Sequence, residues 1–244
     1  MSGPDELRAA FRAAALAPSL IEQRAELSRL TVETFAATGR DLHICGWIIG
    51  PDRAAGTSPF GNGSDETVAV STLLRIATQL IGGAVRLFGG GEVYAGASLL
   101  RQLVEVEYLA WAFDTRDGDA ERWMRSDRKE RQQLFAPANL RKGSAGRFRD
   151  QDYTFHCEHG GHPVPGASSL LEGDPAFVQL LVVDMLGHSG RTWDHLVGWA
   201  RSASLGKFVL DRSAEMSAGY GAWKSADPLA NLPPPSTDVH SSRH

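Results

Sequence analysis

The sequence predicts an all-α protein, a single-domain helical bundle of six to seven helices, and three observations support this. Apolar residues recur with helical spacing along most of the chain, capping residues and glycine or proline breaks separate the helical stretches, and no clear strand ladder occurs. With 244 residues and 42% apolar content, the chain can bury one sizeable core. We expect a bundle domain over residues 1–224 and a disordered Pro/Ser-rich tail over 225–244.

Local signals delimit the helices of the N-terminal half. Ser19 and Glu22 form a capping box that opens a helix ending at Gly39. The run LHICGWIIG that follows is ambiguous between a strand and a helix turn, and GPDRAAGTSPFGNGSDE has the composition of a long surface loop. Asp65 is expected to cap the next helix, which should end at the glycines 89–91.

The second half of the chain carries equally clear signals. A helix from residue 92 to about 114 is apolar around most of its circumference, which is typical of a central element. A highly charged helix over about 119–136 and a basic, glycine-rich loop should follow it. Asp174 followed by proline predicts the start of a long helix that reaches about residue 204. A last helix near residues 209–223 completes the bundle.

Composition limits the class of protein without naming a function. The formal net charge of -4 is mild, so it neither demands nor excludes an anionic partner. Cys45 and Cys157 lie far apart without a CxxC spacing, which argues against a disulfide framework or a cysteine-built zinc site. Asp5 and Glu6 stand where a signal peptide would be basic, and no stretch approaches the roughly eighteen apolar residues that a membrane helix requires. We therefore expect a cytoplasmic protein that does not enter a membrane.

Two helices carry polar stripes on otherwise apolar surfaces. On the helix from Pro175, the side chains of Asp184, His188 and His195 share one stripe with large apolar residues. The spacing of Asp184 and His188, four residues apart, allows both to bind one metal ion. The alternatives are an Asp-His pair that fixes the helix in place, or a stripe that is simply exposed.

On the helix from Glu92, the stripe includes Arg101 and Glu105, which can pair, while Glu107 points to the opposite side. We expect one of these two carboxylates to lie inside the bundle, and the alternative is that the Arg101 stripe is the solvated face. The hypothesis of a metal-dependent enzyme takes as ligands of Zn, Fe or Mn the residues Glu105, Asp184, His188 and either His195 or His156.

The segment YTFHCEHGGHP, residues 153–163, gathers three histidines, a cysteine and a glutamate. His156 and His159 face one side of a helix, and His162 follows a glycine break. By itself the segment lacks a fourth zinc ligand at standard spacing. We expect a short helix with its exit loop, docked against the helix that bears Arg101 and Glu105.

Arg149 and His156 are separated by six residues, in RDQDYTFH. This resembles the R-x4-6-H signature of the HEPN superfamily, all-α proteins that include metal-independent ribonucleases of bacterial toxin and defence systems. The resemblance implies that Arg149 and His156 of two protomers meet in a homodimer and cleave RNA without a cofactor. Residues 121–149 contain nine basic and three acidic residues that could supply phosphate contacts. The alternative is a solvated helix face followed by a flexible loop.

A second resemblance covers about residues 92–163. The stretch LLRQLVEVEYLAWAF, followed by Tyr153, a small residue four positions later and a His-Pro pair, resembles a bacterial helical family of unknown function. It implies that Arg101, Glu105 and His162 form one cluster, and it implies no reaction. The preferred functional hypothesis is thus a HEPN-like RNA-binding protein or ribonuclease. The alternatives are a metal-dependent helical-bundle enzyme and a non-catalytic ligand-binding or scaffold protein.

Overall fold

The structure is a computed structural model that describes residues 3–231. Helices dominate this part of the chain and no strand occurs in it, which confirms the all-α class. Five long helices form the body of the protein: α2 (Pro18–Ile48), α4 (Asp65–Gly89), α5 (Val93–Thr115), α11 (Pro175–Ala200) and α12 (Lys207–Ala226).

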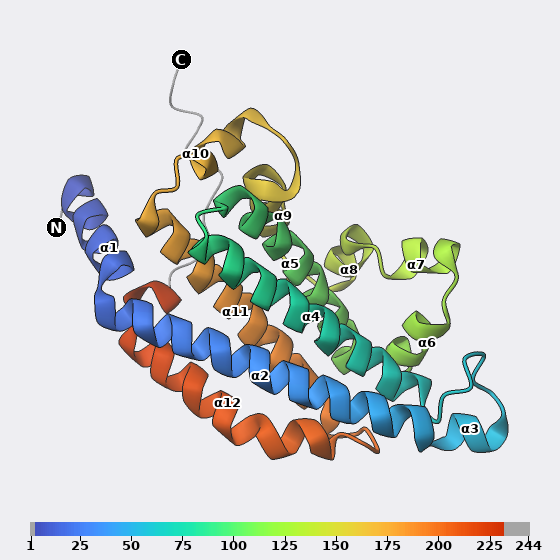
Figure 1. Cartoon of the computed structure of the whole chain (residues 1–244). Coiled ribbons are helices and arrows are strands. Elements are labelled where there is room, and N and C mark those ends of the chain that lie inside the picture. Colours follow the sequence, from blue (N-terminus) through green and yellow to red (C-terminus); the bar gives the residue numbers. More distant parts are fainter. Residues whose placement is uncertain (1–2, 232–244) are drawn as a thin grey trace.

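The long helices pack as a closed ring in which α2 contacts α4, α4 contacts α5, α5 contacts α11, and α12 closes the ring between α11 and α2 (Figure 1). Helix α11 also contacts α2 and α4. Its Trp193 is stacked on Phe35 of α2 with ring centroids 5.5 Å apart. Helix α5 is buried on most sides, as its apolar circumference predicts.

Short helices cover the ends and one flank of this body. They are α1 (Pro4–Leu16), α3 (Pro51–Ala55), α6 (Asp119–Arg125), α7 (Arg128–Leu134), α8 (Pro137–Gly143), α9 (Asp150–His156) and α10 (Ser168–Leu171). Single turns occur at η1 (Cys157–Gly161), η2 (Pro165–Ala167) and η3 (Pro228–Asn231). The expected count of six to seven helices was therefore wrong. The charged segment 119–136 breaks where the Asp127 carboxylate caps a new helix by accepting from the backbone N–H of Glu130.

Three expected boundaries or caps in the N-terminal half were also wrong. Helix α2 begins at Pro18 after the N-cap Ala17, so Ser19 lies inside the helix and does not cap it. Helix α2 continues through Gly39 and includes most of the ambiguous LHICGWIIG run. Gly39 serves close packing instead, since a Cβ built there would lie 3.3 Å from Leu74 Cβ of α4. Ser64, not Asp65, caps α4 by accepting from the Thr67 N–H. The expected Asp174 cap is confirmed, because its carboxylate accepts from the Ala176 N–H.

The C-terminal boundary lies later than residue 225, where the disordered tail was expected to begin. Helix α12 runs to Ala226, and η3 follows with Asp227 and Leu229 buried. Residues 225–231 are held because the Asp227 carboxylate binds groups inside the bundle. The rest of the expected tail, residues 232–244, lies outside the described residues.

Contrary to the sequence-based expectation, one helix among the described residues is long and apolar enough to cross a membrane. Helix α4 contains an 18-residue window of mean hydropathy 1.5. Slightly more than half of that window, 56%, is buried inside the fold, and the core helices of globular proteins meet the same criterion. Membrane association and cellular location therefore remain predictions.

A buried ion pair joins α2, near the start of the chain, to the segment that follows α12. The Arg24 side chain of α2 donates from Nε and Nη2 to the two oxygens of Asp227, over 2.7 and 3.0 Å. The same guanidinium donates to the Ala15 carbonyl at the end of α1. Trp223 Nε1 also donates to Asp227 over 2.9 Å, and both carboxylate oxygens accept hydrogen bonds. Helix α1 and the η3 turn are thereby fixed to α2.

We predict that Asp227→Asn destabilises the fold by about 3–5 kcal/mol, because it leaves the Arg24 charge buried and unpaired. Burial would raise the pKa of Asp227, but the hydrogen bonds from Arg24, the Leu229 backbone and Trp223 lower it below its ordinary value. The contribution of the pair is therefore complete above the unfolded-state pKa of about 3.9 and is lost as pH falls through the lower folded-state pKa. Urea unfolding across this pH range measures it.

Glu33→Gln is the matched control, because it breaks the exposed Arg29–Glu33 pair on the same helix. It should change the free energy of unfolding by about 0.5 kcal/mol or less. Equal losses in both variants would contradict the structural role of the buried pair.

Candidate functional site

A polar cluster on the outer side of α5 joins Arg101, Glu105 and Tyr153. Arg101 Nη2 lies 3.2 Å from Glu105 Oε1 and donates to the Tyr153 hydroxyl over 2.8 Å. The hydroxyl in turn donates to Glu105 over 3.0 Å. Beside it, Ser98 Oγ donates to the Gly160 carbonyl over 2.6 Å. These contacts confirm that the 153–163 segment docks against the helix bearing Arg101 and Glu105.

The cluster differs from the expected one in its third member. Tyr153 bridges the charged pair, whereas the side chain of His162 is exposed beyond the η1 turn. The His162 backbone N–H donates to the Cys157 carbonyl, which closes that turn. Gly160 makes the turn possible, since its φ of 130° suits glycine and a Cβ there would lie 2.8 Å from the backbone of Ala97 and Ser98.

A second cluster lies inside the bundle, between α9 and α11. His156 Nε2 is 3.2 Å from His188 Nε2, 3.4 Å from Asp184 Oδ2, and the other Asp184 oxygen is 3.5 Å from His188 Nε2. Both imidazoles are buried. Asp184 Oδ2 is buried without a hydrogen-bond partner. One potential ligand atom from each residue therefore lies within 4.8 Å of the other two.

Glu107 of α5 orients this cluster from behind. Its carboxylate, 2% exposed, lies 2.5 Å from His188 Nδ1 and accepts from Arg191 Nε over 2.8 Å. Burial would raise the pKa of Glu107, but the charges and hydrogen bonds of His188 and Arg191 lower it to about 2. Glu107 and Arg191 Nη2, which is 2.8 Å away, both engage Nδ1 of His188. The other ring nitrogen, Nε2, lies toward His156 and Asp184.

His156 is held in its neutral form. Burial lowers the pKa of His156 to about 4, an effect that Asp184 opposes only in part. At neutral pH the ring therefore carries a lone pair that can bind a cation.

Two of the expected metal ligands lie elsewhere. Glu105 belongs to the Tyr153 cluster on the outer side of α5. His195, although on the same stripe as His188, bonds through Nδ1 to Asp114 over 2.8 Å, and its buried Nε2 has no partner. Of the expected metal ligands, Asp184, His188 and the alternative His156 lie together, whereas Glu105 and His195 do not join them. Glu107 is the carboxylate inside the bundle.

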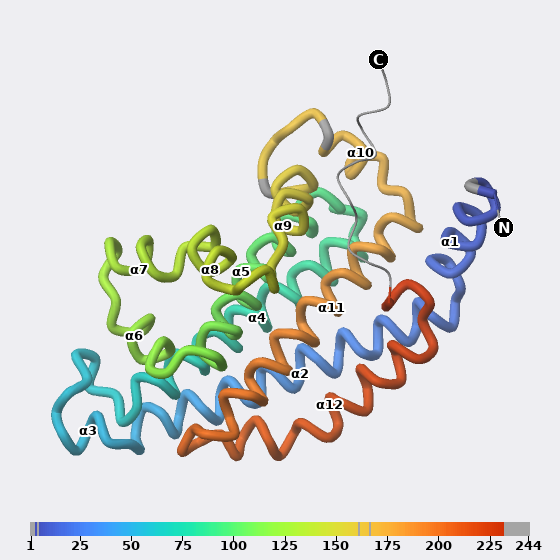
Figure 2. Tube along the Cα trace, turned by 180° about the vertical axis from the view of Figure 1, so that it is seen from behind, coloured from blue at the N-terminus to red at the C-terminus, as the bar shows by residue number. Residues whose placement is uncertain are grey.

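The inner cluster forms part of the wall of a cavity of about 670 Å³. Its lining comes from α1, α5, the loop before α9, α9, α11, α12 and η3. Figure 2 shows the N-terminal half of α11 between α9 on one side and α1 with the C-terminal segment on the other. The volume lies in the range of ligand pockets, and Asp184 and His188 lie midway along the α11 wall.

Arg149 and His156, the two residues of the ribonuclease hypothesis, both line this cavity. Arg149 is half-exposed and paired with Asp152, whereas His156 faces inward. Several of the basic residues expected to contact phosphate are already engaged: Arg122 pairs with Glu130, and Arg125 pairs with Asp52, Asp65 and Glu121. Part of the positive charge of this segment is thus neutralised within the fold.

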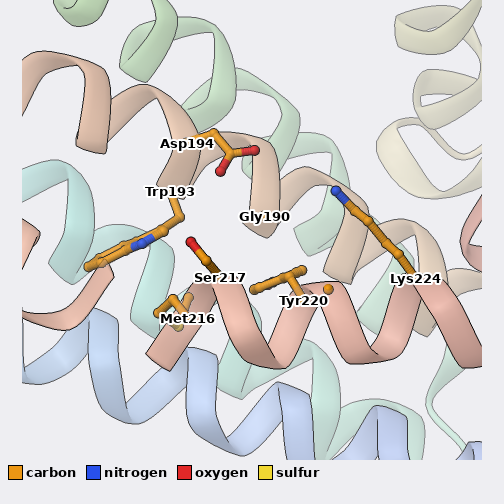
Figure 3. Close-up of a pocket in the computed structure, with 8 residues that line it drawn as sticks. Gly190, Trp193, Asp194, Met216, Ser217, Tyr220 and Lys224 are labelled. Atoms are coloured by element: carbon orange, nitrogen blue, oxygen red, sulfur yellow. The ribbon is translucent and has the colours of Figure 1, made fainter. Parts of the chain in front are cut away.

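A smaller cavity, of about 180 Å³, lies between α11 and α12 (Figure 3). Its labelled polar residues are Asp194, Ser217, Tyr220 and Lys224. The Tyr220 hydroxyl is bonded to Thr31 Oγ1 over 3.0 Å, so it serves packing against α2. This cavity lacks the convergence of ligand atoms that the inner cluster has.

Comparison with family models, curated proteins and solved structures found no match to this chain. The HEPN resemblance and the resemblance to a helical family of unknown function therefore stay predictions. The fold and the site define an all-α protein with a buried cluster of two histidines and one carboxylate beside a cavity.

We predict that Tyr153→Phe lowers the free energy of unfolding by about 1–2 kcal/mol, because it removes hydrogen bonds to two charged groups. Tyr94→Phe is the control, since Tyr94 is also partly buried on α5 but its hydroxyl has no partner within the described residues. Chemical denaturation measures both. Equal effects would show that the bridge to Arg101 and Glu105 adds no stability.

Proposed function

We propose that this protein is a metal-dependent enzyme in which His156, Asp184 and His188 bind one divalent transition-metal ion. The observation that carries the proposal is the proximity of their potential ligand atoms, which lie within 4.8 Å of one another, with one carboxylate oxygen buried and without a hydrogen-bond partner. Two imidazoles and a carboxylate are ligands that zinc and ferrous iron accept.

The spacing favours zinc. Ligands 2.0–2.1 Å from a tetrahedral ion lie about 3.3–3.4 Å apart, whereas neighbouring ligands of an octahedral ion lie about 2.9–3.1 Å apart. The distances from His156 Nε2 to His188 Nε2 and to Asp184 Oδ2, 3.2 and 3.4 Å, are close to the tetrahedral value. Catalytic zinc sites commonly have three protein ligands and keep the fourth position for water or substrate.

The surroundings suit catalysis better than a purely structural role. The three residues line a ligand-sized cavity, so a fourth position can be reached by a small molecule. With zinc held by His156, Asp184 and His188, the site would supply Lewis-acid activation of a water molecule. The reaction class that follows is hydrolysis, in which the water adds across the bond that breaks and no further reactant is needed.

We predict about one zinc ion per chain in protein purified without an affinity tag, measured by elemental analysis. Asp184→Ala and His188→Ala should each reduce the zinc content to background, because two remaining ligands bind zinc weakly.

His195→Ala is the matched control, since it removes an equally buried imidazole from the same helix without touching the cluster. It should leave the zinc content unchanged. Zinc that is lost in His195→Ala but retained in His188→Ala would refute the assignment of ligands.

We further predict that Glu107→Gln weakens zinc binding by about 10–100-fold, because the carboxylate orients His188 and increases its basicity. Chelator competition measures the dissociation constant. Glu105→Gln, two residues away on α5 but bonded to Tyr153, should leave that constant unchanged.

A second candidate is the RNA-cleaving homodimer suggested by the HEPN resemblance. The observation that favours it is that Arg149 and His156 line one cavity. Against it, His156 is only 4% exposed, and an RNA phosphate would have to enter the bundle to reach it. A homodimer and a cytoplasmic location remain predictions, and the metal site requires neither.

Cleavage of total RNA in the presence of EDTA separates the two candidates. The metal-site proposal predicts no cleavage that depends on this protein. Cleavage that persists in EDTA and disappears in both Arg149→Ala and His156→Ala would establish the ribonuclease instead.

A further inference from the structure

The cavity beside the inner cluster changes character along α11. Phe177, Leu180 and Leu181 line it over the first two turns, Asp184 and His188 follow, and Arg191 comes one turn later. Apolar side chains of other elements complete the first part of the lining: Phe11 from α1, Phe155 from α9, Trp223 from α12, and Leu229 and Ala230 from η3. The metal ligands therefore lie between an apolar region and a charged region.

Several of these apolar side chains are only partly buried, although they belong to the two hydrophobic clusters of the fold. Phe11, Leu180 and Val183 pack against a small cluster of Ala15, Ala176 and Leu229, and Phe177 packs against the main core. The cavity thus lies between the two clusters and leaves apolar surface uncovered. An apolar ligand group would remove that surface from water.

Without a metal ion the charged lining is balanced, with three arginines and three carboxylates. Arg149 pairs with Asp152 and Arg191 pairs with Glu107, which leaves Asp184 and Arg147. Arg147 is exposed at the cavity and has no ion pair within the described residues. A divalent ion beside Asp184 leaves one unbalanced positive charge, and Arg147 adds a second. The cavity therefore favours an anionic ligand.

From these observations, we infer that the substrate is an amphipathic anion, with its anionic group between the metal ion and Arg147 and its apolar part along the first two turns of α11. The inference rests on the proposed metal site. Phe177 lies seven residues before Asp184, about 10 Å along the helix axis, which suits an unbranched acyl chain of medium length or an aromatic ring system. A carboxylate head on such an apolar body is the simplest ligand of this kind.

Calorimetric titration of the zinc-loaded protein tests this with three probes. Octanoate combines charge and tail, 1-octanol has the tail alone, and acetate has the charge alone. We expect octanoate to bind at least about tenfold more tightly than either of the others, because only octanoate uses both regions. Arg147→Gln should weaken octanoate binding by about tenfold and leave octanol binding unchanged.

Arg128→Gln is the control, because it removes an exposed arginine outside the cavity and should not alter octanoate binding. Octanoate that binds no more tightly than octanol to protein holding zinc would overturn the inference and leave the metal site intact. Protein that holds no zinc would overturn the metal site, and with it the inference that depends on it. Zinc analysis of the same samples distinguishes the two failures.

Discussion

The candidate site depends on the burial of one carboxylate, that of Glu107. An ion removed from water is costly unless it is paired, and both partners of Glu107, His188 and Arg191, come from α11. These partners are one turn apart, so they fix both the rotation and the axial position of α11 relative to α5. The same contact engages Nδ1 of His188 and leaves Nε2 toward His156 and Asp184. The geometry of the cluster follows from this pairing.

Local signals predicted the helices well where a single physical requirement decides the outcome. Asp174 followed by proline starts α11 because a carboxylate acceptor and a proline at the first position both suit a helix start. Gly39 was misjudged because glycine ends a helix only when the chain leaves the helical conformation there. At Gly39 the absence of a side chain instead allows α4 to pack closely against α2. That contact spans residues far apart in the sequence, which local patterns cannot detect.

The sequence predicted only part of the site, because the rest also depends on contacts that local patterns do not show. A helical wheel places Asp184, His188 and His195 on one stripe, but it ignores distance along the axis. His195 is seven residues beyond His188, about 10 Å, and meets Asp114 instead. The sequence could not show whether Glu105 or Glu107 lies inside the bundle, because α5 is apolar around most of its circumference. Only the position of α11 shows that Glu107 faces inward.

The outer and inner clusters are connected through α9. Tyr153 and His156 are three residues apart on this short helix, and they turn to α5 and α11 respectively. A seven-residue helix is marginally stable alone, so its position must come from tertiary contacts. The bridge from Tyr153 to Arg101 and Glu105, and Arg141 stacked 4.2 Å above the Tyr153 ring, supply such contacts. Arg101 and Glu105 therefore act on the proposed metal centre from a distance, by fixing the helix that presents His156 to Asp184 and His188.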